Sequence, residues 1–285
     1  MLTVRDRHTD AEGQAADLRN LVAVGAKALL VDPVDPAGLS ATVKELVDDG
    51  IVVVSIGRPI PDSGAYSIGT DQERLGEDGA TWLLSTLRGK GKVLVIAGPR
   101  DDPVEQARRT GFDRALKLFK GAGVAATIDS KGDPSVAVKG LNDVIADKLE
   151  FAGIWTSGVD SVIVDALRMA DQPYVPILGS DDSAFVGLLL VTSGLRGAVI
   201  TDSPAVGGTA LRIARDALAG SPPAQPDTLL VPKLWDNADD GGRSHLLEAN
   251  DPAIDPAWPL DLTIPGWTEA TPEQVVACGE APAPS

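Results

Sequence analysis

The amino-acid sequence predicts an α/β protein with two lobes, each a doubly wound parallel sheet covered by helices, for three reasons. Short runs rich in Val, Ile and Leu alternate with segments of helical periodicity along most of the chain. These runs are continuously apolar, as strands covered on both faces must be. The runs also outnumber the ~5–6 strands that one sheet usually holds, and 285 residues suffice for two lobes with a core each.

The predicted strands are the apolar runs themselves. They cover residues 26–32, 50–56, 66–70, 91–97, 123–128, 152–156, 175–179, 197–202 and 228–236. The segments between them are predicted helices. Segment 36–48 shows the pattern well, because Leu39 and Val43 recur on one face and Pro36 suits the first turn. Asp71 is the expected N-cap of the helix that follows the third strand.

The alternation stops near the end of the chain. Residues 238–285 are rich in Asp, Pro and Gly, and we expect an irregular tail with little helix beyond a turn near 271–277. Trp258 and Trp267 are the apolar side chains expected to anchor this tail on a lobe.

Composition excludes several classes of function. A net charge of −16 argues against nucleic-acid binding, which needs clustered Lys and Arg. One cysteine, Cys278, rules out an intrachain disulfide or a Cys-based zinc site, and His8 and His245 alone cannot form a His-rich metal site. No GxSxG, HExxH or P-loop motif is present. We therefore expect neither an enzyme nor a metal or cofactor.

Hydrogen-bonding side chains follow most of the predicted strands. They are Asp32, Arg58, Asp71, Asp160 with the Thr156-Ser157-Gly158 turn, Asp181, Thr201 and Asp202, joined by Arg108 from the expected first turn of the helix after strand 91–97. Ligands of open α/β sheets bind beyond the carboxyl ends of the strands. For each residue taken singly, a role in a surface loop or a helix cap is the better explanation. Together, these carboxylates and guanidiniums suit a ligand dense in hydroxyls, which donate and accept at once.

Several stretches carry a family resemblance. They include QAADLRNLVAVGAKALLVDPVDPAGLSATVKELVDDGIVVVSIGR, ARRTGFDRAL, VKGLNDVI and GIWTSGVDSVIVDALRMA. They resemble the sugar-binding type I periplasmic binding proteins, the ribose-binding-like group that serves ABC transporters, over roughly residues 8–236. The resemblance implies two Rossmann-like lobes joined by three crossovers, with a ligand cleft between them that closes by hinge motion and changes nothing chemically.

The resemblance also assigns roles to particular residues. Asp32 takes the place of the family's Asn or Asp after the third strand. Arg58 and Arg108 stand at arginines that bond ligand hydroxyls, one in each lobe, and we expect them to face each other across the cleft. Asp181 stands at the carboxylate that closes a strand.

Three further residues complete the predicted site. Thr201 falls near a family glutamine, and Asp160 follows the turn at the end of strand 152–156. Trp155 is a candidate stacking face because Ser135 occupies the place of the family's usual aromatic, although a Trp within a strand is more often core. Gly57 also departs from the family, which has an acidic residue before the arginine.

The predicted N-terminal lobe comprises 1–89 and 203–224, and the C-terminal lobe comprises 90–202 and 225–237, before the tail. Leu2-Thr3-Val4 corresponds to the family's second strand, so we expect the first strand, the first helix and an export signal to be absent. Strand 26–32 would then have an unpaired edge unless Leu2-Thr3-Val4 pairs with it, and this short form is expected to bind sugar poorly.

The expected function is binding of a small neutral sugar or polyol and its delivery to the membrane permease of an ABC importer. The full-length family form is expected to be monomeric and extracytoplasmic, in the periplasm or lipid-anchored at the cell surface. The alternatives are the effector-binding core of a lactose-repressor-type regulator, which needs an upstream helix-turn-helix, and a sugar sensor module.

Overall fold

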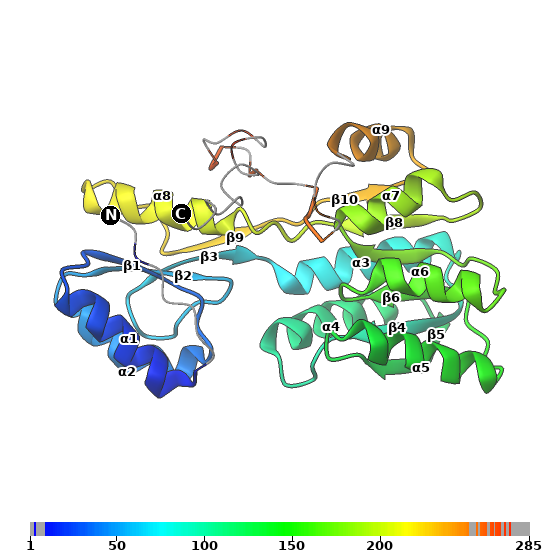
Figure 1. Cartoon of the computed structure of the whole chain (residues 1–285), viewed down its shortest axis with the longest axis horizontal. Coiled ribbons are helices and arrows are strands. Elements are labelled where there is room, and N and C mark those ends of the chain that lie inside the picture. The colour runs from blue at the N-terminus through cyan, green and yellow to red at the C-terminus, as the bar shows by residue number, and fades with distance from the viewer. Residues whose placement is uncertain are drawn as a thin grey trace, which may run out of the picture. The chain divides into compact units, whose positions relative to one another are not determined.

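The computed structural model describes residues 3, 9–250, 255, 257–260, 263–264, 266–268, 271 and 274. The chain divides into two compact units. The first contains Met1–Thr70, Ser203–Leu230 and Leu262–Ser285, and the second contains Asp71–Asp202 and Val231–Asp261. Both are α/β with parallel sheets, as predicted (Figure 1).

Within the described residues, the first unit has a four-stranded parallel sheet in the order β1-β2-β3-β9. Its strands are β1 (Ala28–Val31), β2 (Val52–Ile56), β3 (Tyr66–Thr70) and β9 (Asp227–Leu230). Its helices are α1 (Ala11–Ala23), α2 (Pro36–Asp48) and α8 (Val206–Leu218). Val53 packs with α1 and α2, whereas its neighbour Val54 packs with α8. Successive side chains thus enter opposite cores, which makes the unit doubly wound.

The second unit has a six-stranded sheet in the order β10-β8-β7-β6-β4-β5, parallel except for β10. The strands are β4 (Lys90–Ala97), β5 (Gly121–Asp129), β6 (Gly153–Thr156), β7 (Ile177–Ser180), β8 (Gly197–Ile200) and β10 (Leu234–Asp236). The helices are α3 (Gln72–Thr86), α4 (Pro103–Leu116), α5 (Pro134–Ala146), α6 (Asp160–Met169), α7 (Ser183–Val191) and α9 (Asp240–Ala249). Helices α3 and α4 cover one face, and α5, α6, α7 and α9 cover the other.

Aspartate side chains begin most of these helices. The N-caps whose carboxylate accepts a hydrogen bond from a first-turn amide are Asp10, Asp35, Asp71, Asp102, Asp133, Asp182 and Asp239. Asp71 is therefore the N-cap that the sequence predicts, and it accepts from the Arg74 amide at 3.0 Å. Each such cap contributes ~0.5–2 kcal/mol to stability, so part of the acidic composition serves helix initiation.

The structure corrects the predicted strand 228–236. Residues Asp227–Leu230 form β9 beside β3 in the first unit, and Leu234–Asp236 form β10 beside β8 in the second. Pro232 lies in the connection, where its missing N–H and fixed φ interrupt strand pairing. The expected lobe boundary near residue 225 is accordingly wrong, because the chain changes units after Leu230.

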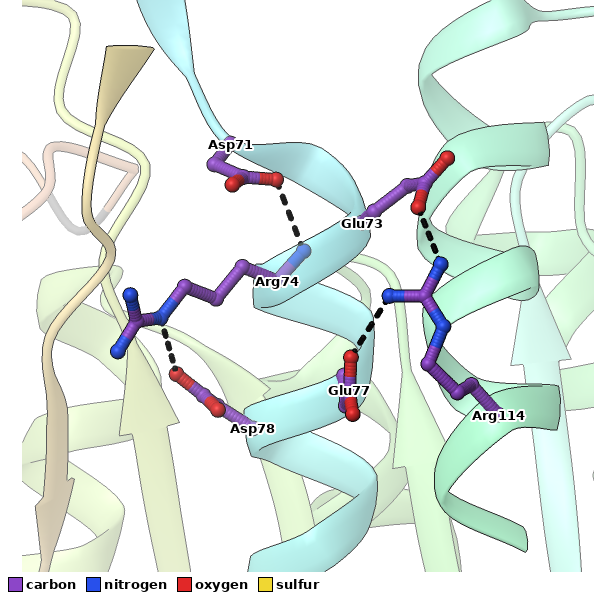
Figure 2. Close-up of polar contacts among 6 residues, drawn as sticks. All are labelled: Asp71, Glu73, Arg74, Glu77, Asp78 and Arg114. Carbon is purple, nitrogen blue, oxygen red and sulfur yellow. Dashed lines mark hydrogen bonds and ion pairs between the residues drawn. The ribbon is translucent and has the colours of Figure 1, made fainter. Parts of the chain in front are cut away.

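Helix α3 belongs to the second unit and not, as expected, to the first. It crosses α4 in backbone contact: a Cβ on Gly76 would lie 1.9 Å from the Arg108 carbonyl oxygen, and one on Gly111 would lie 1.9 Å from the Glu73 carbonyl oxygen. Arg114 of α4 donates to Glu73 at 2.6 Å and to Glu77 at 2.9 Å on α3, and these contacts are drawn in Figure 2. The first crossover therefore precedes α3, at Thr70 and Asp71.

We expect Gly76→Ala to lower the free energy of unfolding by at least ~1–3 kcal/mol, because overpacking against backbone cannot be relieved by a rotamer change. Urea denaturation measures this difference. The matched control is Gly187→Ala in α7, where a Cβ meets nothing within 4 Å. That change is expected to stabilise the helix by ~0.5–1 kcal/mol. Equal stability of the Gly76 variant and the parent would contradict the close crossing.

The segment after residue 237 is more ordered than expected, since α9 occupies Asp240–Ala249. Both tryptophans that we expected to anchor the tail are partly buried. The Trp258 carbonyl accepts from the Ser183 amide and hydroxyl, both at 2.8 Å. Trp267 packs against the core of the first unit, with the Arg212 guanidinium 5.9 Å from its ring centroid. Cys278 and most of 271–277 lie outside the described residues.

At the other end of the chain, Leu2 and Val4 also lie outside the described residues, so their pairing stays a prediction. Strand β1 is the edge of its sheet in the part of the chain that the structure describes, with β2 as its neighbour. No helix among the described residues has the length and apolar character needed to cross a membrane.

Candidate functional site

Three polar side chains meet at the carboxyl end of the sheet in the second unit, and we call them the Arg108 cluster. Arg108 donates from Nε to Gln72 Oε1 and from Nη2 to Asp202 Oδ2, both at 2.7 Å. Gln72 also donates to Asp202 Oδ2 at 3.1 Å, so each of the three side chains contacts the other two. Arg108 lies in the second turn of α4, not in the first as expected. All three side chains remain partly accessible.

The fold positions each member of the cluster. Gln72 is the first residue of α3, and the glycine crossing of α3 and α4 brings it to Arg108. Asp202 is held by its neighbour Thr201, whose amide donates to the Lys233 carbonyl and whose hydroxyl accepts from the Lys233 amide, both at 2.9 Å. Thr201 therefore ties the end of β8 to the strand connection and fixes the position of Asp202 beside Arg108.

Glu105 is a buried carboxyl next to this cluster that the sequence reasoning missed. It lies in the first turn of α4, three residues before Arg108, and its side chain is 6% exposed. Burial raises its pKa, while the Ser157 hydroxyl, the Gly98 backbone and Arg108 act in the opposite direction. Within the described residues, neither Glu105 Oε1 nor Ser157 Oγ completes a hydrogen bond of normal geometry. The sequence does contain a signal for Glu105: it lies three residues before Arg108, a spacing that places both side chains on one face of a helix.

Asp160 links two strand ends. Its Oδ1 accepts from the Thr156 hydroxyl, and its Oδ2 accepts from the Ser180 amide at 2.9 Å and lies 2.6 Å from Ser180 Oγ. Ser180 Oγ also lies 3.0 Å from Asp182 Oδ2. Burial raises the pKa of Asp160 to about 8, and the charge of Asp182 adds to the effect. Both carboxylate oxygens of Asp160 accept hydrogen bonds within the protein, and only 1% of its surface is exposed. Asp160 therefore links the ends of β6 and β7 and does not fit the predicted ligand role.

Trp155 does not fit the predicted stacking role either. Its ring is fully buried in β6, under α3 and α4, and meets the Phe112 ring edge-on with centroids 5.4 Å apart. A ligand cannot reach a ring that is enclosed by core side chains on the central part of a sheet. Asp181 is also buried, at the end of β7, and its carbonyl accepts from the Leu260 amide at 2.9 Å.

Asp32 and Arg58 come together in the first unit, at the carboxyl ends of β1 and β2. The Arg58 guanidinium donates to the Pro33 carbonyl, directly after Asp32. Gln14 supports the same loop by donating to the Asp32 carbonyl at 2.8 Å. Gly57, which stands where the family has an acidic residue, has a φ of +82°. Glycine adopts this left-handed conformation readily, and the resulting turn orients Arg58. The facing of Arg58 and Arg108 involves both units and stays a prediction.

In doubly wound α/β proteins small polar ligands bind at the carboxyl ends of the strands, where both units carry hydrogen-bonding side chains. Residues 2–222 match the family model described as periplasmic binding protein domain. The chain belongs to this family. Its members and the curated relatives are binding proteins, which confirms the prediction that the chain is not an enzyme.

The chain is similar to several characterised proteins. The xylitol-binding protein of Mycolicibacterium smegmatis is 26% identical over 180 residues, which are 61% of this chain and 51% of that protein. The ribose import binding protein of Haemophilus influenzae is 24% identical over 214 residues, 73% of this chain and 71% of that protein. The chain thus spans about half of the first relative's length.

A solved structure has the same fold. The ABC transporter solute-binding protein of Burkholderia graminis in complex with D-arabinose has a TM-score of 0.70 and 20% identity, and the match covers 81% of this chain and 82% of that one. This likeness confirms the predicted type I periplasmic binding protein fold.

Proposed function

We propose that this chain binds a small neutral sugar or polyol and delivers it to the membrane permease of an ABC importer. The observation that carries the proposal is the Arg108 cluster at the carboxyl end of a parallel sheet. Its contacts use two of the five N–H donors of the guanidinium. The remaining donors and the carboxylate of Asp202 offer what a hydroxyl needs, an acceptor for its proton and a donor for its lone pair.

The relatives support the choice of ligand class. Xylitol and ribose, named for two of them, are neutral and carry a hydroxyl on nearly every carbon. We propose Arg108 and Asp202 as ligand contacts in the second unit, and Asp32 and Arg58 as ligand contacts at the strand ends of the first unit. We further propose that the protein acts outside the cytoplasmic membrane as a monomer, because the family is periplasmic and a carrier must reach its permease freely.

A thermal-shift screen tests the ligand class. Pentoses, hexoses and polyols are expected to raise Tm, because a ligand at 100 times its Kd stabilises the folded state by about 2.7 kcal/mol. In a chain of this size that is a rise of several degrees. Amino acids and inorganic phosphate serve as comparison compounds. Stabilisation by these compounds alone would contradict the assignment to sugars.

A further inference from the structure

The arginine of the Arg108 cluster does not present an uncompensated positive charge. Asp202 Oδ2 lies 2.7 Å from Arg108 Nη2, and Gln72 bonds to both side chains. The side chains of Arg108 and Asp202 are 18% and 37% exposed. A ligand that reaches Arg108 therefore meets an ion pair whose two charges are opposite and adjacent.

We propose that Asp202 determines specificity by neutralising Arg108, so that the site accepts a neutral polyhydroxylated ligand and rejects the corresponding sugar acid. This inference rests on the proposed function. It goes further, because it assigns the choice between neutral and anionic ligands to one residue.

The chemistry of the pair explains the discrimination. A free guanidinium binds carboxylates in a bidentate, charge-assisted arrangement and would attract a sugar acid. Here Asp202 already occupies Nη2, and its own charge repels an incoming carboxylate. A hydroxyl instead donates to the Asp202 carboxylate while it accepts from the guanidinium. Gln72, which is neutral, holds the geometry without changing the charge.

Calorimetry of Asp202→Asn with xylitol and xylonate tests the proposal, because these compounds share their carbon number and differ in one carboxylate. The parent protein is expected to prefer xylitol. The variant is expected to shift the ratio of the two affinities toward xylonate by on the order of tenfold or more, the effect of one charged hydrogen bond. This gain should shrink as salt concentration rises.

Two further variants separate the role of Asp202 from the loss of any negative charge. Asp143→Asn removes a carboxylate from the exposed face of α5, where it pairs with Lys139, and should leave the ratio unchanged. In Arg108→Gln/Asp202→Asn the gain should vanish, because the attraction comes from Arg108. Circular dichroism and Tm establish that each variant is folded.

The possible outcomes are distinct. An unchanged ratio in a folded Asp202→Asn protein, or a gain that persists without Arg108, overturns the role of Asp202 while the proposed function stands. If the parent binds no neutral sugar or polyol at all, the proposed function fails, and this inference falls with it.

Discussion

Replacing Arg108 with alanine is expected to weaken sugar or polyol binding by about tenfold to a hundredfold. The guanidinium offers charge-assisted donors to ligand hydroxyls, each worth ~1.5–3 kcal/mol, and 1.4 kcal/mol is a factor of ten in affinity. The change also leaves Asp202 and Gln72 without the group that they contact at the carboxyl end of the sheet. Titration calorimetry with the sugar that gives the largest thermal shift measures the loss.

Arg168→Ala is the matched control for this variant. Arg168 lies on α6 of the same unit, exposed and paired with Asp165, so its removal changes the net charge equally without touching the site. Its affinity should equal that of the parent. Arg58→Ala is expected to weaken binding as well, because Arg58 follows β2 at the carboxyl end of the sheet in the first unit. Full affinity in a folded Arg108→Ala protein would show that the ligand binds elsewhere.

The stability of the protein is expected to fall as pH rises from about 4 to above 8, through Asp160. Burial raises the pKa of this carboxyl from 3.8 to about 8 in the folded state, and the nearby Asp182 has its own pKa raised by burial. The folded chain therefore holds more protons than the unfolded chain between these values. The contribution of Asp160 to the free energy of unfolding is therefore fully present below pH 4 and is lost as pH passes 8. This change is on the order of 3 kcal/mol or more.

Asp160→Asn isolates this effect because an amide mimics the neutral carboxyl. The variant is expected to be more stable than the parent at pH 8.5, by on the order of 3 kcal/mol. At about pH 3 the advantage should disappear, since Asp160 is then protonated in both the folded and the unfolded parent. Urea denaturation at both pH values measures the difference, with the exposed Asp143→Asn as control. A variant with the same pH dependence as the parent would place the titrating group elsewhere.

Local chemistry made much of the fold predictable from the sequence. The apolar runs became strands because a continuous run is stable as a strand only when both faces are covered. Asp71 caps α3 and Pro36 begins α2, since capping and φ restriction act within one turn. The strand ends that carry Asp32 and Arg58 were predictable for the same reason, because the end of a parallel strand determines which sheet edge its next residue occupies.

Only the tertiary structure decided which polar residues lie together and to which unit each element belongs. The bonds from Arg108 to Gln72 and to Asp202 join residues 36 and 94 positions apart, and that from Gln72 to Asp202 spans 130. Such contacts depend on the α3–α4 crossing and on where β9 and β10 pair, which strand and helix periodicity do not encode. The tertiary structure also decided burial. Trp155 and Asp160, which the sequence offered as candidate ligand contacts, lie in the core. A sequence pattern specifies what a segment becomes, whereas its neighbours in space specify what remains exposed to a ligand.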